Sequence, residues 1–134
     1  MKKFLYLGLS VILTLLLAIV LSFSTYDPQK VTSSSFKYHL GIPENIKNIT
    51  VYDDCERARY SFTGRDGERA AFAKISFGSS YTLSELESKY TKAFESIGCN
   101  AADLGSFSCN NNAYSIAFDK KEKCMHVDIE IVVF

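Results

Sequence analysis

Three side chains near the C-terminus have the types and the spacing of a metal site. His126, Asp128 and Glu130 alternate along one expected strand, so they project from one face of it. Imidazole and carboxylate groups are common ligands of divalent metals. The three positions span about 13 Å in an extended strand, however, and one ion cannot reach all of them. We therefore interpret them as a solvated face and expect no metal and no cofactor.

The arginines of the chain form a second candidate site, because all four lie in one short segment. Guanidinium groups bind carboxylates and phosphates through paired hydrogen bonds, so this segment could contact an acidic partner. Acidic residues are interleaved with the arginines, which favours a charged, solvated hairpin. The candidate contact surface for a partner consists of Arg57, Arg59, Arg65 and Arg69.

The cysteines are the third group of reactive side chains. Cys55, Cys99, Cys109 and Cys124 contain no Cys-x-x-Cys pair, so their spacing does not favour zinc. An even number of cysteines beyond an export signal is typical of disulfides. Of the three pairings we favour Cys99–Cys109, because Cys99 leaves a helix towards the strand that carries Cys109. Cys55 and Cys124 both begin strands beside turns and form the second pair.

Sequence motifs of catalysis are absent. The chain has no nucleophile elbow, phosphate-binding loop, glycine-rich dinucleotide turn or His-Glu-x-x-His motif, and it has only two histidines. We therefore expect a protein that is not an enzyme.

The N-terminal segment determines the expected compartment. Phe4–Phe23 is a run of uncharged residues that follows Lys2 and Lys3. A membrane-spanning helix needs roughly 20 apolar residues, and the lysines favour a cytoplasmic N-terminus. We expect a single-pass protein of the cytoplasmic membrane, anchored through residues 4–23, with its C-terminal domain outside. A cleaved signal peptide is the alternative, and it would give a periplasmic or secreted domain.

The rest of the chain has the size of one domain. We expect a signal anchor or signal peptide over residues 1–24, a polar linker over 25–35 and a single exported domain over 36–134. The exported part carries 13 basic and 15 acidic residues, because Lys2 and Lys3 precede it. This balance argues against a nucleic-acid partner, which would require a basic face.

Apolar periodicity predicts the elements of that domain. Short extended segments are expected over residues 36–42 and 49–52, a hairpin over 57–77, and three strands between residue 107 and the C-terminus. A helix is expected over 83–97, with Thr82 and Glu85 as a capping box and Gly98 as its stop. The fold class is α+β: an antiparallel sheet of about five to six strands with one amphipathic helix on one face, preceded by an N-terminal transmembrane or signal helix.

These features predict a small, exported, disulfide-stapled domain that binds an envelope or secreted protein as an inhibitor, immunity or accessory module. The alternative is a structural or assembly subunit of a membrane-envelope complex, in which the apolar N-terminal segment packs against another membrane protein. A third hypothesis is a small hydrolase, which would need two facing carboxylates in a cleft, one of them with a raised pKa.

Overall fold

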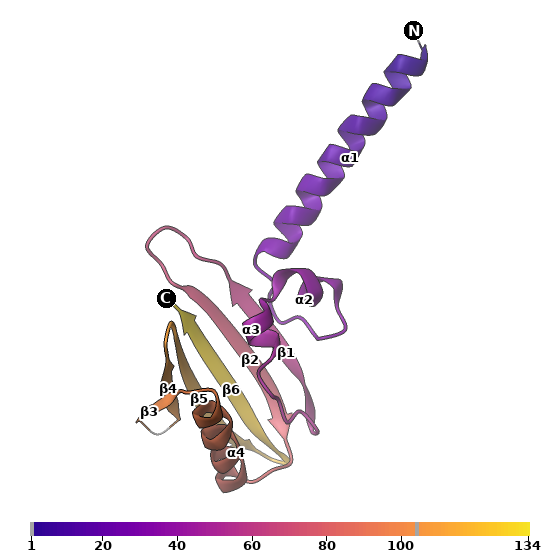
Figure 1. Ribbon diagram of the computed structural model, residues 1–134. Helices are drawn as coiled ribbons and strands as arrows, with labels where there is room; N and C mark the ends of the chain where they lie inside the picture. The colour runs from indigo at the N-terminus through magenta and orange to yellow at the C-terminus, as the bar shows by residue number, and fades with distance from the viewer. Residues whose placement is uncertain (1, 104) are drawn as a thin grey trace.

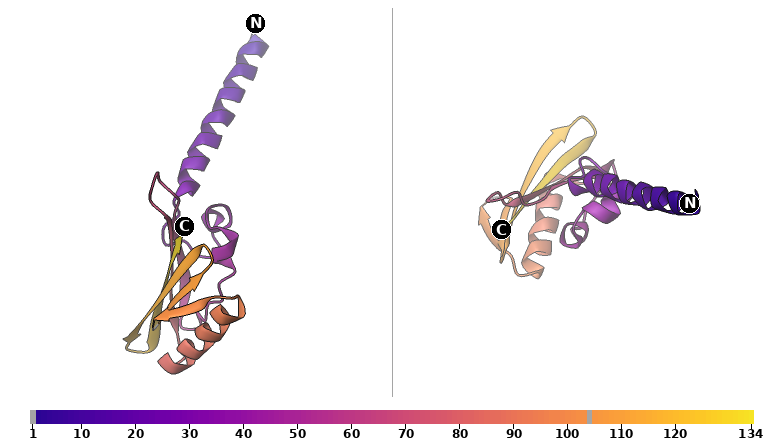
Figure 2. Two further views of the ribbon diagram at one scale, coloured as in Figure 1. Left: turned by 60° about the vertical axis from the view of Figure 1, so that its left-hand side comes forward. Right: turned by 90° about the horizontal axis from the view of Figure 1, so that it is seen from above.

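The computed structural model describes residues 2–103 and 105–134, without the side chains of residues 2–5, 7 and 23–26. A six-stranded antiparallel sheet carries three helices on one face, and a long N-terminal helix projects away from it (Figures 1 and 2). The expected α+β class and antiparallel sheet are thereby confirmed.

The sheet is built mainly from hairpins. Its strand order is β1-β2-β6-β5-β4-β3, and every neighbouring pair is antiparallel. The predicted hairpin over 57–77 forms the first pair, and the last strand lies in the interior of the sheet, between β2 and β5. The strands are β1 Glu56–Thr63, β2 Ala71–Ser79, β3 Asn100–Asp103, β4 Ser106–Cys109, β5 Asn112–Lys121 and β6 Cys124–Val133.

The N-terminal apolar segment lies in α1 (Lys2–Tyr26). Its described apolar side chains are solvent-exposed along the helix, with Leu13 at 69%. Among the side chains that the structure describes, no helix is long and apolar enough to cross a membrane. Four side chains of the expected span, those of Phe4, Leu5, Leu7 and Phe23, lie outside that description.

The expected extended segment over 36–42 is wrong, because these residues form the short helix α2 (Phe36–Gly41). The Ser35 side chain caps it by accepting a hydrogen bond from the amide of Tyr38. Alternating apolar residues fit a helix here because positions four apart share a face. Tyr38 and Ile42 face the core, whereas Phe36 and Leu40 are 61% and 62% exposed.

The strand expected at 49–52 is also absent from the described structure. These residues follow α3 (Glu44–Lys47) as an irregular segment on the helical face of the sheet. Ile49, Val51 and Tyr52 pack against the core from there, and the Thr50 carbonyl accepts a hydrogen bond from Tyr90 Oη at 3.0 Å. The apolar side chains of residues 49–52 are therefore packed against the core although the segment does not pair with a strand.

Residues 27–31, in the stretch expected to be a linker, are bonded to the outer edge of β1. Val31 and Tyr60 exchange two backbone hydrogen bonds of 2.8 Å, and Phe62 N donates to the Pro28 carbonyl at 2.9 Å. Gly64 N donates to Asp27 Oδ1 at 2.9 Å. These bonds protect the edge of β1 and hold the domain close to the end of α1.

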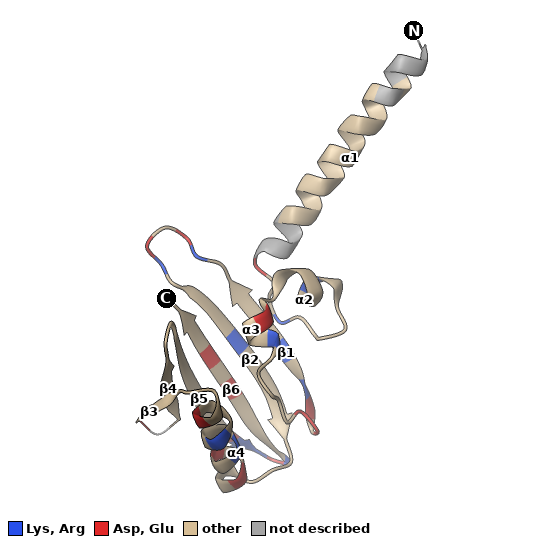
Figure 3. Ribbon diagram, in the orientation of Figure 1, with Lys and Arg blue, Asp and Glu red and all other residues tan. Residues whose placement is uncertain are grey.

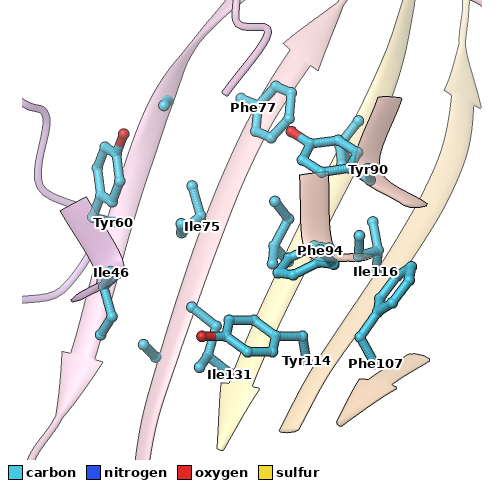
Figure 4. Packing of buried hydrophobic residues seen from close by; sticks show 14 of the residues in the cluster. Ile46, Tyr60, Ile75, Phe77, Tyr90, Phe94, Phe107, Tyr114, Ile116 and Ile131 are labelled. Atoms are coloured by element: carbon cyan, nitrogen blue, oxygen red, sulfur yellow. The ribbon is translucent and has the colours of Figure 1, made fainter. Parts of the chain in front are cut away.

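The core lies between the sheet and α4 (Leu83–Ser96), the helix predicted over 83–97. The capping box of Thr82 and Glu85 is present, and Gly98 has a φ of 82°. Tyr90 and Phe94 point from α4 onto the isoleucines of the central strands (Figure 4). Phe94 packs against Phe107 and Tyr114, with ring centroids 4.7 Å apart in both pairs. Helix and sheet thus share one aromatic and aliphatic core.

Two disulfides staple this fold, in the pairing that the sequence favoured. Cys99–Cys109 joins the exit of α4 to β4, and Cys55–Cys124 joins the start of β1 to the start of β6. Each bond lies at an end of the sheet. Disulfides of this kind persist in oxidising compartments, which supports a location outside the cytoplasm.

Candidate functional site

An open groove of about 640 Å³ lies between α4 and the strands β3 to β5. Its floor is apolar, formed by the buried Phe107 and Ile116 and the half-buried Phe118. Its wall is the polar flank of α4, and β3 and Gly105 form the opposite rim. The helical wall consists of Ser84, Glu87, Ser88, Thr91, Lys92 and Glu95.

The short edge strands leave the groove open. β3 and β4 have four residues each, whereas β5 has ten, so the sheet narrows beside α4. The Cys99–Cys109 bond holds the end of α4 against β4, with the two Cα atoms 4.3 Å apart. Gly105 adopts a φ of 77°, and its carbonyl accepts a 2.7 Å hydrogen bond from Ile116 N. One wall of the groove is therefore covalently fixed relative to its floor.

The groove has an acidic rim. Glu87, Glu95 and Asp103 line it, and Lys92 is the basic residue among its described lining residues. An apolar floor with an acidic rim suits a ligand that combines apolar and basic groups. The polar residues of the described lining are serines, a threonine, a tyrosine, a lysine and acidic residues.

The outer edge of β3 lies beside the groove. β3 is the last strand of the sheet, and its four residues are all exposed. An edge strand presents backbone donors and acceptors to an added strand. An extended segment bound there could place alternate side chains over the groove.

His126, Asp128 and Glu130 lie on the opposite face of the sheet. Lys74 Nζ reaches Asp128 Oδ2 at 3.0 Å and Glu130 Oε1 at 3.4 Å, so both carboxylates pair with a lysine of the neighbouring strand β2. His126 Nε2 is 3.5 Å from Asp128 Oδ1. The face that we expected to be solvated is half-buried at His126 and Asp128 and exposed at Glu130. Within the described part of the chain, no group of three His, Cys, Asp or Glu residues could hold a metal ion.

The pKa values of three carboxyl groups are lowered. Partial burial raises the pKa of Asp128, but hydrogen bonds from Ser76 and Lys74 outweigh it. Hydrogen bonds from the hydroxyl and the amide of Ser80 lower the pKa of Asp54, and the amide and hydroxyl of Thr82 lower that of Glu85. In each case the lowered pKa means that the ionised carboxylate is the favoured form.

The structure divides the four arginines between two parts of the molecule. Arg57 and Arg59 are exposed on β1, whereas Arg65 and Arg69 lie in the β1–β2 turn beyond Thr63. Eight residues of extended chain place Arg57 and Arg65 roughly 25 Å apart. Charges of both signs lie in that turn (Figure 3). The four side chains therefore do not form one anion site. Whether either pair of arginines contacts a partner stays a prediction.

The sequence contains a signal for the groove that our reading of the residues missed. Ser84, Ser88, Thr91 and Glu95 recur at helical spacing on one flank of α4, and three of them are small. Small polar side chains along a helix leave room for a second surface to approach. The β3 edge carried no such signal, because Asn100–Asp103 lacks the β-branched and aromatic residues typical of strands.

Comparison with known proteins identifies no relative: no family model, no curated protein and no solved structure matches this chain.

Proposed function

We propose that this protein is an exported, non-enzymatic binding domain that α1 holds at the outer side of the cytoplasmic membrane. The domain binds an extended segment of an envelope or secreted protein, which adds to β3 and places apolar side chains in the α4–β5 groove. The single observation that carries this proposal is the apolar groove beside an unpaired strand edge, bounded by a disulfide.

The chemistry of the groove supports this choice. Phe107, Ile116 and Phe118 offer an apolar floor, and Glu87 and Glu95 favour basic residues in the bound segment. Backbone hydrogen bonds along a strand edge provide affinity for many sequences, and side-chain pockets provide specificity. The two disulfides suit a small domain that must keep a rigid surface outside the cell.

A second candidate is the assembly subunit. It is favoured by α1, whose described apolar side chains are exposed from Tyr6 to Leu21. In that case α1, rather than the groove, would contact the neighbouring membrane protein, and a change in the groove would leave the association intact.

The experiment that tests the proposal uses a photoreactive amino acid at Ser88, an exposed residue in the wall of the groove. The matched control is Ala117, which is exposed on the opposite face of β5. In intact cells we expect Ser88, but not Ala117, to crosslink one envelope or secreted polypeptide. That polypeptide, once purified, should bind the wild type and the Ala117→Trp variant but not the Ser88→Trp variant.

Two results would contradict the proposal. Equal crosslinking from Ser88 and Ala117 would show that the groove has no special role. Binding that survives Ser88→Trp would do the same, because a tryptophan there fills the groove. Crosslinks obtained only from positions in α1 would favour the assembly subunit instead.

A further inference from the structure

The domain exposes two large apolar side chains where it meets α1. Phe36 and Leu40 lie four residues apart on α2, so they share one helical face. They are 61% and 62% exposed, whereas Tyr38 on the opposite face is buried. Two such residues on one turn of a short helix form a patch that the described part of the fold does not cover.

The patch lies on a helix that contacts α1. The two helices are in contact, and α2 lies beside the domain-side end of α1 (Figure 1). The apolar side chains described in α1 are about half or more exposed, as Phe36 and Leu40 are. Exposed apolar side chains therefore occur on both of the helices that are in contact.

The position of the patch relative to α1 is fixed rather than loose. The chain is bonded to the sheet at Asp27, the first residue after α1, and again at Pro28 and Val31. The chain between α1 and the domain is therefore hydrogen-bonded to the sheet from its first residue onward. If α1 is in a bilayer, its end lies at the lipid surface, and α2 is held there with it.

Two lysines belong to this part of the chain: Lys37 follows Phe36 in α2, and Lys30 lies in the segment between α1 and α2. Lys30 and Lys37 are exposed, and the position of Lys30 is set by a 2.9 Å bond from its amide to Ser61 Oγ. The acidic groups nearby are already engaged: Asp27 accepts from Gly64 N, and Glu44 pairs with Lys47 at 2.9 Å. Two lysines beside an apolar patch complement the phosphates of a lipid headgroup layer.

We propose that α2 is a lipid-interface helix. Phe36 and Leu40 insert into the outer leaflet beside α1, and Lys30 and Lys37 contact headgroup phosphates of anionic lipid. The domain thereby sits with a defined side towards the membrane. This inference rests on the membrane anchor of the proposed function, but not on the groove or its partner.

The chain contains no tryptophan, so a single introduced tryptophan reports its own surroundings. Three full-length variants, Phe36→Trp, Ile97→Trp and Leu13→Trp, are reconstituted into vesicles of phosphatidylcholine and phosphatidylglycerol with brominated acyl chains. Ile97 is the matched control, since it is 66% exposed at the end of α4. We expect bromolipids to lower Phe36→Trp emission about twofold and to leave Ile97→Trp emission unchanged.

The Leu13→Trp variant separates failure of the inference from failure of the anchor. Quenching of Leu13→Trp without quenching of Phe36→Trp would overturn the interface helix and leave the anchor standing. Absence of quenching at both positions would overturn both. A blue-shifted Phe36→Trp emission that bromolipids do not quench would place a protein, not lipid, on the patch and would also overturn the proposal.

The lysines are tested in the same system. Replacing phosphatidylglycerol by phosphatidylcholine should weaken quenching of Phe36→Trp, and Lys30→Gln/Lys37→Gln should abolish this difference between the two vesicle types. Quenching that is equal in both vesicle types before the lysines are changed would contradict their role at the headgroups.

Discussion

Gly78 lies so close to Glu56 that a Cβ atom on the glycine would come within 2.7 Å of the Glu56 Cβ. The two residues face each other at the start of β1, where the register shifts. Cys55 N donates to the Gly78 carbonyl at 3.1 Å, and Cys55 is bonded to Cys124 at the start of β6. The close approach of the two backbones at Gly78 therefore holds Cys55 near Cys124, to which it is bonded.

We expect Gly78→Ala to lower the free energy of unfolding by about 1–3 kcal/mol, because the added methyl group forces the start of β1 away. Urea denaturation measures this change. The double variant Glu56→Gly/Gly78→Ala removes the closest atom and should recover part of the loss. A Gly78→Ala variant as stable as the wild type would show that β1 moves without cost.

The two disulfides should differ in what they contribute. Their sequence separations are 69 and 10 residues, and the longer loop restricts the unfolded chain more. The chain-entropy estimate is about 4.4 kcal/mol for Cys55–Cys124 and about 2.7 kcal/mol for Cys99–Cys109. Serine replacement of each pair, followed by denaturant unfolding, measures the difference. A larger loss for the shorter loop would mean that native packing, not chain entropy, dominates.

The ion pair on the open face of the sheet predicts a dependence on pH. The lowered pKa of Asp128 means that its contribution to stability is present above its ordinary pKa of about 3.9 and is lost as pH falls through the folded-state pKa. We expect Asp128→Asn to cost roughly 1–2 kcal/mol at pH 7. The difference between variant and wild type should shrink as pH falls below about 4.

Denaturation at several pH values checks this expectation. Lys74→Met serves as the control, because it removes the partner of Asp128 while keeping the carboxylate. A loss for Asp128→Asn that is the same at pH 7 and pH 3 would show that packing, rather than the charge, sets the effect.

Lys89 joins α4 to two tyrosines on neighbouring segments. Its Nζ lies 4.8 Å from the ring centroid of Tyr52 and 4.7 Å from that of Tyr81. We expect Lys89→Met to lower the free energy of unfolding by about 0.5–2 kcal/mol, since the aliphatic stem is kept and the cation–π attraction is lost. In a double-mutant cycle with Tyr52→Leu, the two changes should be less than additive. Simple additivity would exclude direct coupling.

Local signals predicted the elements that depend on neighbours in the sequence. The capping box at Thr82, the apolar stripe of α4 and the glycine at position 98 act within one or two helical turns. The β1–β2 hairpin follows in the same way from alternation on either side of a turn. The favoured disulfide pairing also agreed with the structure, because both pairs lie at ends of correctly predicted elements.

Predictions failed where two conformations satisfy one apolar pattern. Phe36, Tyr38, Leu40 and Ile42 alternate as a strand would, yet positions four apart also share a helical face, and the Ser35 cap decides for the helix. Residues 49–52 have strand propensity, but the edge of β1 is already occupied by Val31. Propensity alone does not say whether a strand edge is available.

The sequence by itself determined the α+β class, the helix α4 and the main hairpin, because each follows from periodicity and caps over short distances, and it favoured the two disulfides because the cysteines lie at the ends of these elements. Only the tertiary structure brought α4 beside β3 to β5 to form the groove and placed Lys74 within reach of both Asp128 and Glu130. These relationships join residues far apart in the chain. Strand order and packing set the distances between them, and neither can be inferred from a local sequence pattern.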